Sequence, residues 1–154
     1  MDFFVYDDQL TVKEIEKFIE ENDVHRVFST RFRWHGEFVR HFEKLIAAKQ
    51  ILIFRQNGRL AGMCSWALVN NHRKKDINKS RWTLPDNVSE GNILYIDVCL
   101  LQSGASIFKI KTHFMRNLWP VFDEVFWYNI PNSKVFRLKI KGGTTCPKEV
   151  PIAV

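Results

Sequence analysis

The run ILYIDVCLL at residues 93–101, followed by QSGAS at residues 102–106, decides the fold of this chain. Nearly continuous apolar runs of this kind are typical of central strands that are buried on both faces of a sheet. The glycine and serines that follow break the run. Residues 106–118 then repeat apolar side chains at helical spacing as far as Pro120, and residues 125–128 form another apolar run. The stretch therefore predicts a strand, a helix and a further strand.

The residues before this stretch predict a β-hairpin. The aliphatic run at residues 51–54 is followed by Asn57-Gly58, the strongest short-range hairpin signal, and residues 60–69 supply the partner strand. Residues 70–91 are polar and contain a proline and a glycine, which indicates a long connection. Connections of this length in compact domains are usually functional or mobile.

The N-terminal third predicts one strand and two helices. Residues 3–6 read as a short strand. Thr11 and Glu14 form a capping box in which each side chain can bond the other residue's amide, so a helix is expected over residues 11–22. Apolar residues on one face predict a second helix over residues 34–49.

The C-terminal end carries weaker signals. Residues 133–141 are predicted as a short basic helix closed by Gly142-Gly143, and the tail as an edge strand or a loose extension. The expected order is β-α-α-β-β-β-α-β-α with a weak final strand. It predicts an α/β fold of the α+β type, in which one mixed sheet is flanked by helices in a single domain of 154 residues.

Composition narrows the class of protein. With 45% hydrophobic and 14% aromatic residues the chain can bury a core, and no apolar run approaches the roughly 20 residues of a membrane helix. Three widely spaced cysteines argue against a disulfide framework and against a zinc site, so we expect a cytoplasmic protein without a metal. The net charge of +6 and pI near 9.3 suit an anionic partner. The cluster Arg73-Lys74-Lys75 is the candidate contact for nucleic acid or an acidic protein.

The order of elements resembles the GNAT acyltransferase fold. In that fold the fourth strand leads into a loop and a helix N-terminus that cradle the pyrophosphate of the donor. Helix N-termini bind anions through free amides and the helix dipole. The resemblance therefore implies a donor-binding loop, and in this chain it comprises Gln102, Ser103, Gly104, Ala105 and Ser106.

A sharper local resemblance is to the toxin-activating lysine acyltransferases, which use acyl carrier protein as the donor. It rests on the strand Met63-Cys-Ser-Trp-Ala67, the polar stretch 70–91 and Leu94-Tyr-Ile-Asp97. In that family a strand aspartate and an N-terminal histidine carry the reaction. The resemblance implies a catalytic role for Asp97, with His25 or His35 as its partner; both histidines remain candidates.

Asp97 also stands out on physical grounds, because a lone carboxylate inside an apolar strand needs a cation, hydrogen-bond donors or a solvated cleft. Regular alternation puts Tyr95, Asp97 and Cys99 on one face of the strand. We expect Asp97 to open onto a pocket that it shares with an N-terminal histidine. The alternative is a structural aspartate paired with an arginine.

Two functions follow as hypotheses. The first is an acyltransferase that moves an acyl or acetyl group from a thioester donor, acyl-CoA or acyl carrier protein, to an amine. The second is a catalytically inactive GNAT-like binding module of a phage or mobile element that binds nucleic acid or a host protein. The donor loop discriminates between them, because an active enzyme keeps an open anion site there.

Overall fold

A computed structural model of the chain describes residues 1–24, 26, 28, 31–78, 83–118, 122–129, 134–139 and 148–152; within these ranges it leaves the side chains of Lys74 and of residues 128 onward undescribed. Seven strands, three α-helices and one 3₁₀ helix follow one another in these parts of the chain. They are β1 (Asp2–Phe4), α1 (Val12–Asn22), α2 (His35–Ala47), β2 (Ile51–Gln56), β3 (Arg59–Val69), η1 (Asn71–Asn78), β4 (Ile93–Leu101), α3 (Ile107–Asn117), β5 (Glu124–Asn129), β6 (Lys134–Lys139) and β7 (Lys148–Ile152).

The strands form one sheet whose spatial order, β1 to β7, is also their order in the sequence. Neighbouring strands pair antiparallel except for β4 and β5, which pair parallel because α3 connects them. β2 and β3 form the predicted hairpin around Asn57-Gly58, and β4 is the central strand. These predictions are confirmed.

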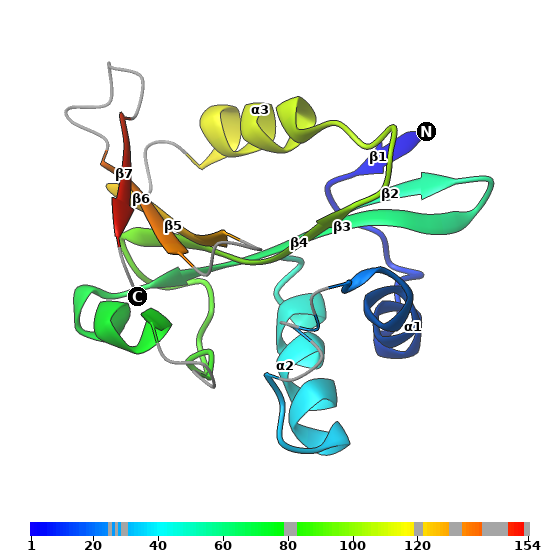
Figure 1. The fold of residues 1–154 in the computed structure, drawn as a ribbon, viewed down its shortest axis with the longest axis horizontal. Coiled ribbons are helices and arrows are strands. Elements are labelled where there is room, and N and C mark those ends of the chain that lie inside the picture. Colours follow the sequence, from blue (N-terminus) through cyan, green and yellow to red (C-terminus); the bar gives the residue numbers. More distant parts are fainter. Residues whose placement is uncertain are drawn as a thin grey trace.

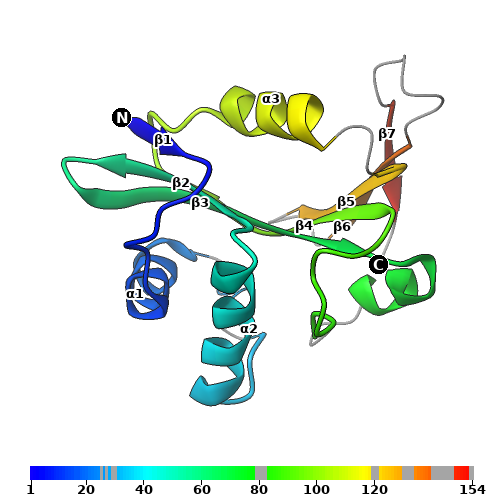
Figure 2. The same ribbon diagram turned by 180° about the vertical axis from the view of Figure 1, so that it is seen from behind.

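Helices cover both faces of the sheet (Figure 1). α1, α2 and η1 lie on one face and α3 lies on the other, and the view from behind shows the same two layers (Figure 2). One core cluster fills the space under α1 and α2, where Phe42 and Leu45 are fully buried. A second cluster lies under α3, which contributes Ile110 and Phe114. The mixed sheet flanked by helices confirms the predicted fold class, and its arrangement is consistent with a GNAT-like fold.

The N-terminal end is anchored by capping and by ion pairs. Thr11 caps α1 by accepting a hydrogen bond from the Glu14 amide at 3.2 Å, as predicted. The carboxylate of Glu14, which was expected to reach back to the Thr11 amide, instead binds the Arg55 guanidinium at 2.6 Å. Arg55 also donates to Asp7 at 2.7 Å. One arginine on β2 thus holds both α1 and the segment that follows β1.

The C-terminal end corrects one prediction. The segment expected to be a helix over residues 133–141 contains β6, which pairs with β5 from Lys134 opposite Asn129 to Lys139 opposite Glu124. Its basic and aliphatic residues are compatible with either state, and pairing with a neighbouring strand decides between them. The expected edge strand of the tail is β7, which pairs with β6. The long connection 70–91 contains η1, so its first part is helical.

Candidate functional site

A β-bulge in β4 isolates Asp97. Ser65 on β3 is opposite Val98, whereas the next residue, Trp66, is opposite Ile96, so Asp97 has no partner residue. An extra residue of this kind shifts the alternation of the bulged strand. Val98 therefore joins the core under α1 and α2, and Cys99 packs on the opposite side under α3. The expected common face of Tyr95, Asp97 and Cys99 is wrong beyond the bulge for this reason.

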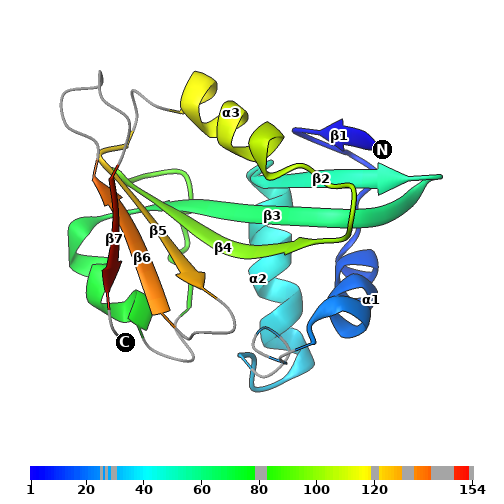
Figure 3. The same cartoon turned by 45° about the horizontal axis from the view of Figure 1, so that its top comes forward.

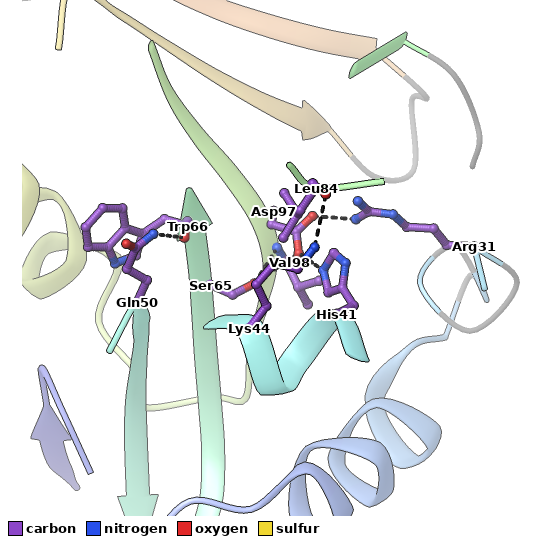
Figure 4. Close-up of polar contacts among 9 residues, drawn as sticks. All are labelled: Arg31, His41, Lys44, Gln50, Ser65, Trp66, Leu84, Asp97 and Val98. Atoms are coloured by element: carbon purple, nitrogen blue, oxygen red, sulfur yellow. Dashed lines mark hydrogen bonds and ion pairs between the residues drawn. The ribbon is translucent and has the colours of Figure 1, made fainter. Parts of the chain in front are cut away.

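The bulge directs the Asp97 carboxylate into a buried cluster of polar side chains (Figure 4). Arg31 donates to Oδ1 of Asp97, and Nε2 of His41 lies 2.6 Å from Oδ2. The hydroxyl of Ser65 lies 3.4 Å from Oδ2 and accepts a hydrogen bond from the Val98 amide at 3.1 Å. The side chains of Asp97, His41 and Arg31 are 0%, 3% and 8% exposed.

The charges in this cluster stabilise the ionised form of Asp97. Burial alone would raise its pKa, but the attraction of Arg31 and the hydrogen bonds from Arg31 and His41 outweigh burial and hold the pKa well below its usual range. Burial likewise opposes the charge of Arg31, and the attraction of Asp97 together with hydrogen bonds to Asp97 and Tyr95 raises the Arg31 pKa. Arg31 and Asp97 therefore form a charged pair in the interior.

His41 is neutral in this setting. Burial lowers its pKa; the attraction of Asp97 acts in the other direction, and repulsion from Arg31 and Lys44 adds to the lowering. Since the ionised Asp97 can only accept, Nε2 of His41 carries the proton and Nδ1 carries the lone pair. Among the described residues, no group forms a hydrogen bond to that Nδ1. The site thus holds an oriented imidazole with a free basic nitrogen.

A small pocket adjoins the histidine. It has a volume of about 50 Å³ and is lined by Arg31, Phe32, Glu37, Arg40, His41, Lys44 and Thr83. A volume of this size holds a few water molecules or one small functional group. Asp97 lies behind His41 and does not line the pocket. Arg31 and His41 both line the pocket, so a group that enters it lies next to the imidazole.

These pKa shifts predict that acid destabilises the protein in two stages. A group whose pKa is lowered by folding contributes stability above its unfolded pKa and loses it as the pH falls. For His41 the loss begins below about pH 6.5, and for Asp97 it begins below about pH 3.9. Urea unfolding between pH 8 and pH 4 should show the first decline, and His41→Gln should reduce its slope.

Two other histidines help to interpret this urea measurement. His113 on α3 also has a pKa lowered by burial, so His41→Gln should reduce the decline and leave part of it. His35→Gln replaces an exposed histidine of the same helix and shows what the loss of a histidine away from Asp97 does to the curve. A His41→Gln curve that runs parallel to the parent over the whole range would contradict the assigned neutral state.

Of the two histidines expected near Asp97, the structure describes one, and it does not contact the aspartate. His35, at the start of α2, is exposed and bonds Glu16 of α1 at 2.9 Å. His25 lies outside the described residues. The histidine that contacts Asp97 is His41, which the sequence reasoning missed along with Arg31 and Ser65. A signal for His41 existed, because it shares the buried face of α2 with Phe38 and Leu45.

The predicted donor loop lies between β4 and α3. Gln102 is tied to β3 through its amide and to Asn22 of α1 through its side chain, and Ala105 bonds back to Gln102. Ser103 and Gly104 are exposed. Ser106 is the N-cap of α3, and its side chain caps no amide. In the first turn of α3 the Lys109 amide donates to the Ser106 carbonyl at 3.2 Å, and the Ser106 side chain leaves the other amides of this turn uncapped.

β4 and β5 diverge at the level of the bulge (Figure 3). They pair from Ile93 opposite Glu124 to Ile96 opposite Trp127, and the described residues show no β5 partner for β4 beyond Ile96. Among the described residues, the part of β4 from Val98 to Leu101 thus pairs with β3 alone. It leads directly into the loop at residues 102–106.

The basic cluster belongs to η1. Arg73 donates to the backbone oxygen of Thr83 at 2.7 Å and lies 3.6 Å from Asp76, so it helps to hold the connection together. Lys75 is exposed, and the side chain of Lys74 is outside the description.

The described residues hold no group of three or more side chains suited to a metal ion. They also include no helix that is long and apolar enough to cross a membrane. Cys64 and Cys99 are free thiols.

Comparisons with known proteins give similarity to solved structures and none to known sequences. No protein-family model matches the chain, and no curated protein matches its sequence. Among solved structures, the chain is similar to an N-acetyltransferase from Staphylococcus aureus Mu50, with a TM-score of 0.40 and 14% sequence identity over 79% of this chain and 76% of the other.

Proposed function

We propose that this protein is an acyltransferase that moves an acyl group from a thioester donor to an amine. One observation carries the proposal: the ionised Asp97, placed at a bulge where β4 leaves β5, holds a neutral His41 beside a pocket. A positioned histidine with a free ring nitrogen is suited to take a proton from an attacking group. Bulges are frequent next to active sites because they re-aim a side chain.

In the proposed reaction the amine nitrogen attacks the acyl carbon, and the carbon–sulfur bond breaks with its electron pair leaving on sulfur. Nδ1 of His41 takes the proton that the amine loses. Asp97 fixes the tautomer through Nε2 and stabilises the imidazolium that forms, so it acts as a positioning residue. Arg31 keeps Asp97 ionised while this happens.

The proposed donor site uses the segment from the bulge to α3. Free amides at the start of a helix favour a phosphate, and the loop of Gln102, Ser103, Gly104, Ala105 and Ser106 presents such a start. The edge of β4 that β5 leaves unpaired can hydrogen-bond an extended ligand. The pantetheine arm common to CoA and acyl carrier protein has amide groups for such bonds, and this chemistry supports either donor.

Ser106→Asp tests the donor site. A carboxylate at the N-cap complements the helix dipole and should maintain or slightly raise stability. The same charge should repel a donor phosphate and weaken CoA binding by roughly tenfold or more, since like charges a few ångströms apart interact by more than 1 kcal/mol. Isothermal titration with CoA measures the change, and thiol release from acetyl-CoA, longer acyl-CoA and acyl carrier protein with amine acceptors measures turnover.

Asn117→Asp supplies the matched control, because it adds the same charge at the other end of α3. It should leave CoA binding unchanged. The acyltransferase proposal fails if the parent protein neither binds CoA at millimolar concentration nor releases thiol from any of these donors above the buffer rate.

A binding module without catalysis is the second candidate. The observation in its favour is the complete burial of Asp97 in an ion pair with Arg31, which is also what a purely structural carboxylate would show. Such a module would use its basic surface, Arg73, Lys74 and Lys75 included. Duplex DNA binding that weakens steeply with salt and with alanine at these three positions, in a protein without thiol-release activity, would favour it.

A further inference from the structure

The outer face of α3 is cationic and has no internal counter-charge. The helix contains Lys109, Lys111 and Arg116, all exposed, and residues 98–122 contain no aspartate or glutamate. None of these three cations forms an ion pair with a described residue. By contrast, Arg31, Arg55 and Arg73 in the rest of the fold are each paired with a carboxylate. The charge of α3 is therefore available to a partner.

Two large apolar side chains stand among these cations. Ile110 and Phe114 face the sheet and are 1% and 5% exposed, whereas Phe108 is 76% exposed and Met115 is 41% exposed. Residues seven apart lie two turns apart on one side of a helix. Helical geometry then places Lys111 on one flank of the Phe108–Met115 ridge, and Lys109 and Arg116 on the other.

Part of the exposed apolar surface of the protein belongs to this helix. Of the nine large apolar side chains that are exposed in the described residues, three belong to α3, namely Ile107, Phe108 and Met115, and Met1 lies next to the loop that precedes it. β1 lies beside the loop that leads into α3 (Figure 3), and a side chain added at Gly104 would meet Met1. Contiguous exposed apolar surface with a polar rim is typical of an interaction site.

We propose that the outer face of α3 is a docking surface for an acidic amphipathic helix of a partner protein. An apolar ridge on the partner would cover Phe108 and Met115, and carboxylates beside that ridge would meet Lys111 on one flank and Lys109 and Arg116 on the other. Helices commonly recognise one another through such ridges, with flanking charges that select the partner. The net charge of +6 would also speed the encounter with an acidic protein. This docking proposal does not depend on whether the protein catalyses acyl transfer.

Other anionic partners fit the same face less well. A helix that lies in a lipid surface needs a wide apolar face, and the apolar face of α3 is already used by Ile110 and Phe114 in the core. Nucleic acid binds through a continuous set of cations along its phosphates, and here Phe108 and Met115 stand between the cations. A second copy of this chain carries the same net charge of +6, which opposes its approach.

A designed peptide provides the test. The probe is an 18-residue helical peptide with leucines on one face and glutamates on both flanks, and fluorescence anisotropy with the full chain measures its affinity. We expect saturable binding that weakens at least tenfold in Phe108→Ala and in the triple variant Lys109→Glu, Lys111→Glu, Arg116→Glu. A peptide with lysines in place of the glutamates should bind the triple variant and not the parent. Lys13→Glu with Lys17→Glu, on exposed positions of α1, should leave binding unchanged.

Four outcomes would overturn the proposal. The first is equal affinity of the acidic peptide for the parent and the triple variant. The second is equal affinity for a peptide of the same composition whose leucines are scattered, since that indicates charge attraction alone. The third is stronger binding of anionic vesicles or duplex DNA that depends on Phe108 and Lys111. The fourth is self-association of the parent that Phe108→Ala abolishes.

Discussion

Alanine in place of His41 is expected to slow acyl transfer by about 10²–10⁴-fold, the usual contribution of a positioned general base. The reason is the geometry at Asp97: the imidazole is held at 2.6 Å through Nε2, and no other described side chain with a free basic nitrogen lines the pocket. Thiol release under saturating donor and acceptor measures the rate. Because the neutral ring is the active form, the parent rate should fall as the pH drops through the His41 pKa, which lies below its ordinary value.

The pH profile separates a base from a structural histidine. His41→Ala should give a low rate that no longer follows this titration, while donor binding at residues 102–106 is retained. His35→Ala changes an exposed histidine of the same helix and should retain the parent rate and profile. An active His41→Ala protein with the parent profile would remove His41 from the mechanism, even if the acyltransferase activity itself is found.

Asp97→Asn is expected to lower the free energy of unfolding by about 3–5 kcal/mol at neutral pH. The substitution preserves shape but leaves the guanidinium of Arg31, only 8% exposed, without its counter-charge. It also removes the acceptor that orients His41. Urea denaturation measures the loss, and for a domain of this size each kcal/mol also lowers the melting temperature by roughly 2–4 °C.

Two further variants make this result interpretable. Glu14→Gln makes the same chemical change in a partly exposed pair with Arg55 and should cost less than about 1 kcal/mol. Arg31→Leu combined with Asp97→Leu removes both charges and should recover most of the lost stability, since apolar replacement of a buried pair is often neutral. If Asp97→Asn is as stable as the parent, the ion pair does not support the fold.

The fold was predictable where local signals agree with tertiary pairing. Asn57-Gly58 sets the hairpin, the Thr11 cap starts α1, and the apolar run of β4 identifies the centre of the sheet. β6 was not predictable by the same means, because its basic and aliphatic residues suit a helix in isolation. It forms a strand because it pairs with β5, and the sequence of β6 alone does not reveal that pairing.

The candidate site was predictable only as far as Asp97. The sequence indicates that a carboxylate inside an apolar strand needs partners. It does not indicate which way the carboxylate points, because that direction is set by the bulge in the pairing of β4 with β3. The regular alternation expected for Tyr95, Asp97 and Cys99 therefore failed at this one residue. His41 was not among the candidate histidines, His25 and His35, and only the packing of α2 against the sheet brings it to Asp97.

The order of the strands in the sheet has a consequence for synthesis of the chain. Since spatial order equals sequence order, each strand from β2 onward can join the open edge of the existing sheet as it emerges from the ribosome. The joining of β4 is the decisive step, because Asp97 is separated from Arg31 by 66 positions and from His41 by 56. Until residue 97 has been translated, the ion pair between Arg31 and Asp97 cannot form. The N-terminal half is thus held back from final packing until the chain is two-thirds made, and the strand that completes its interior is also the strand that completes the site.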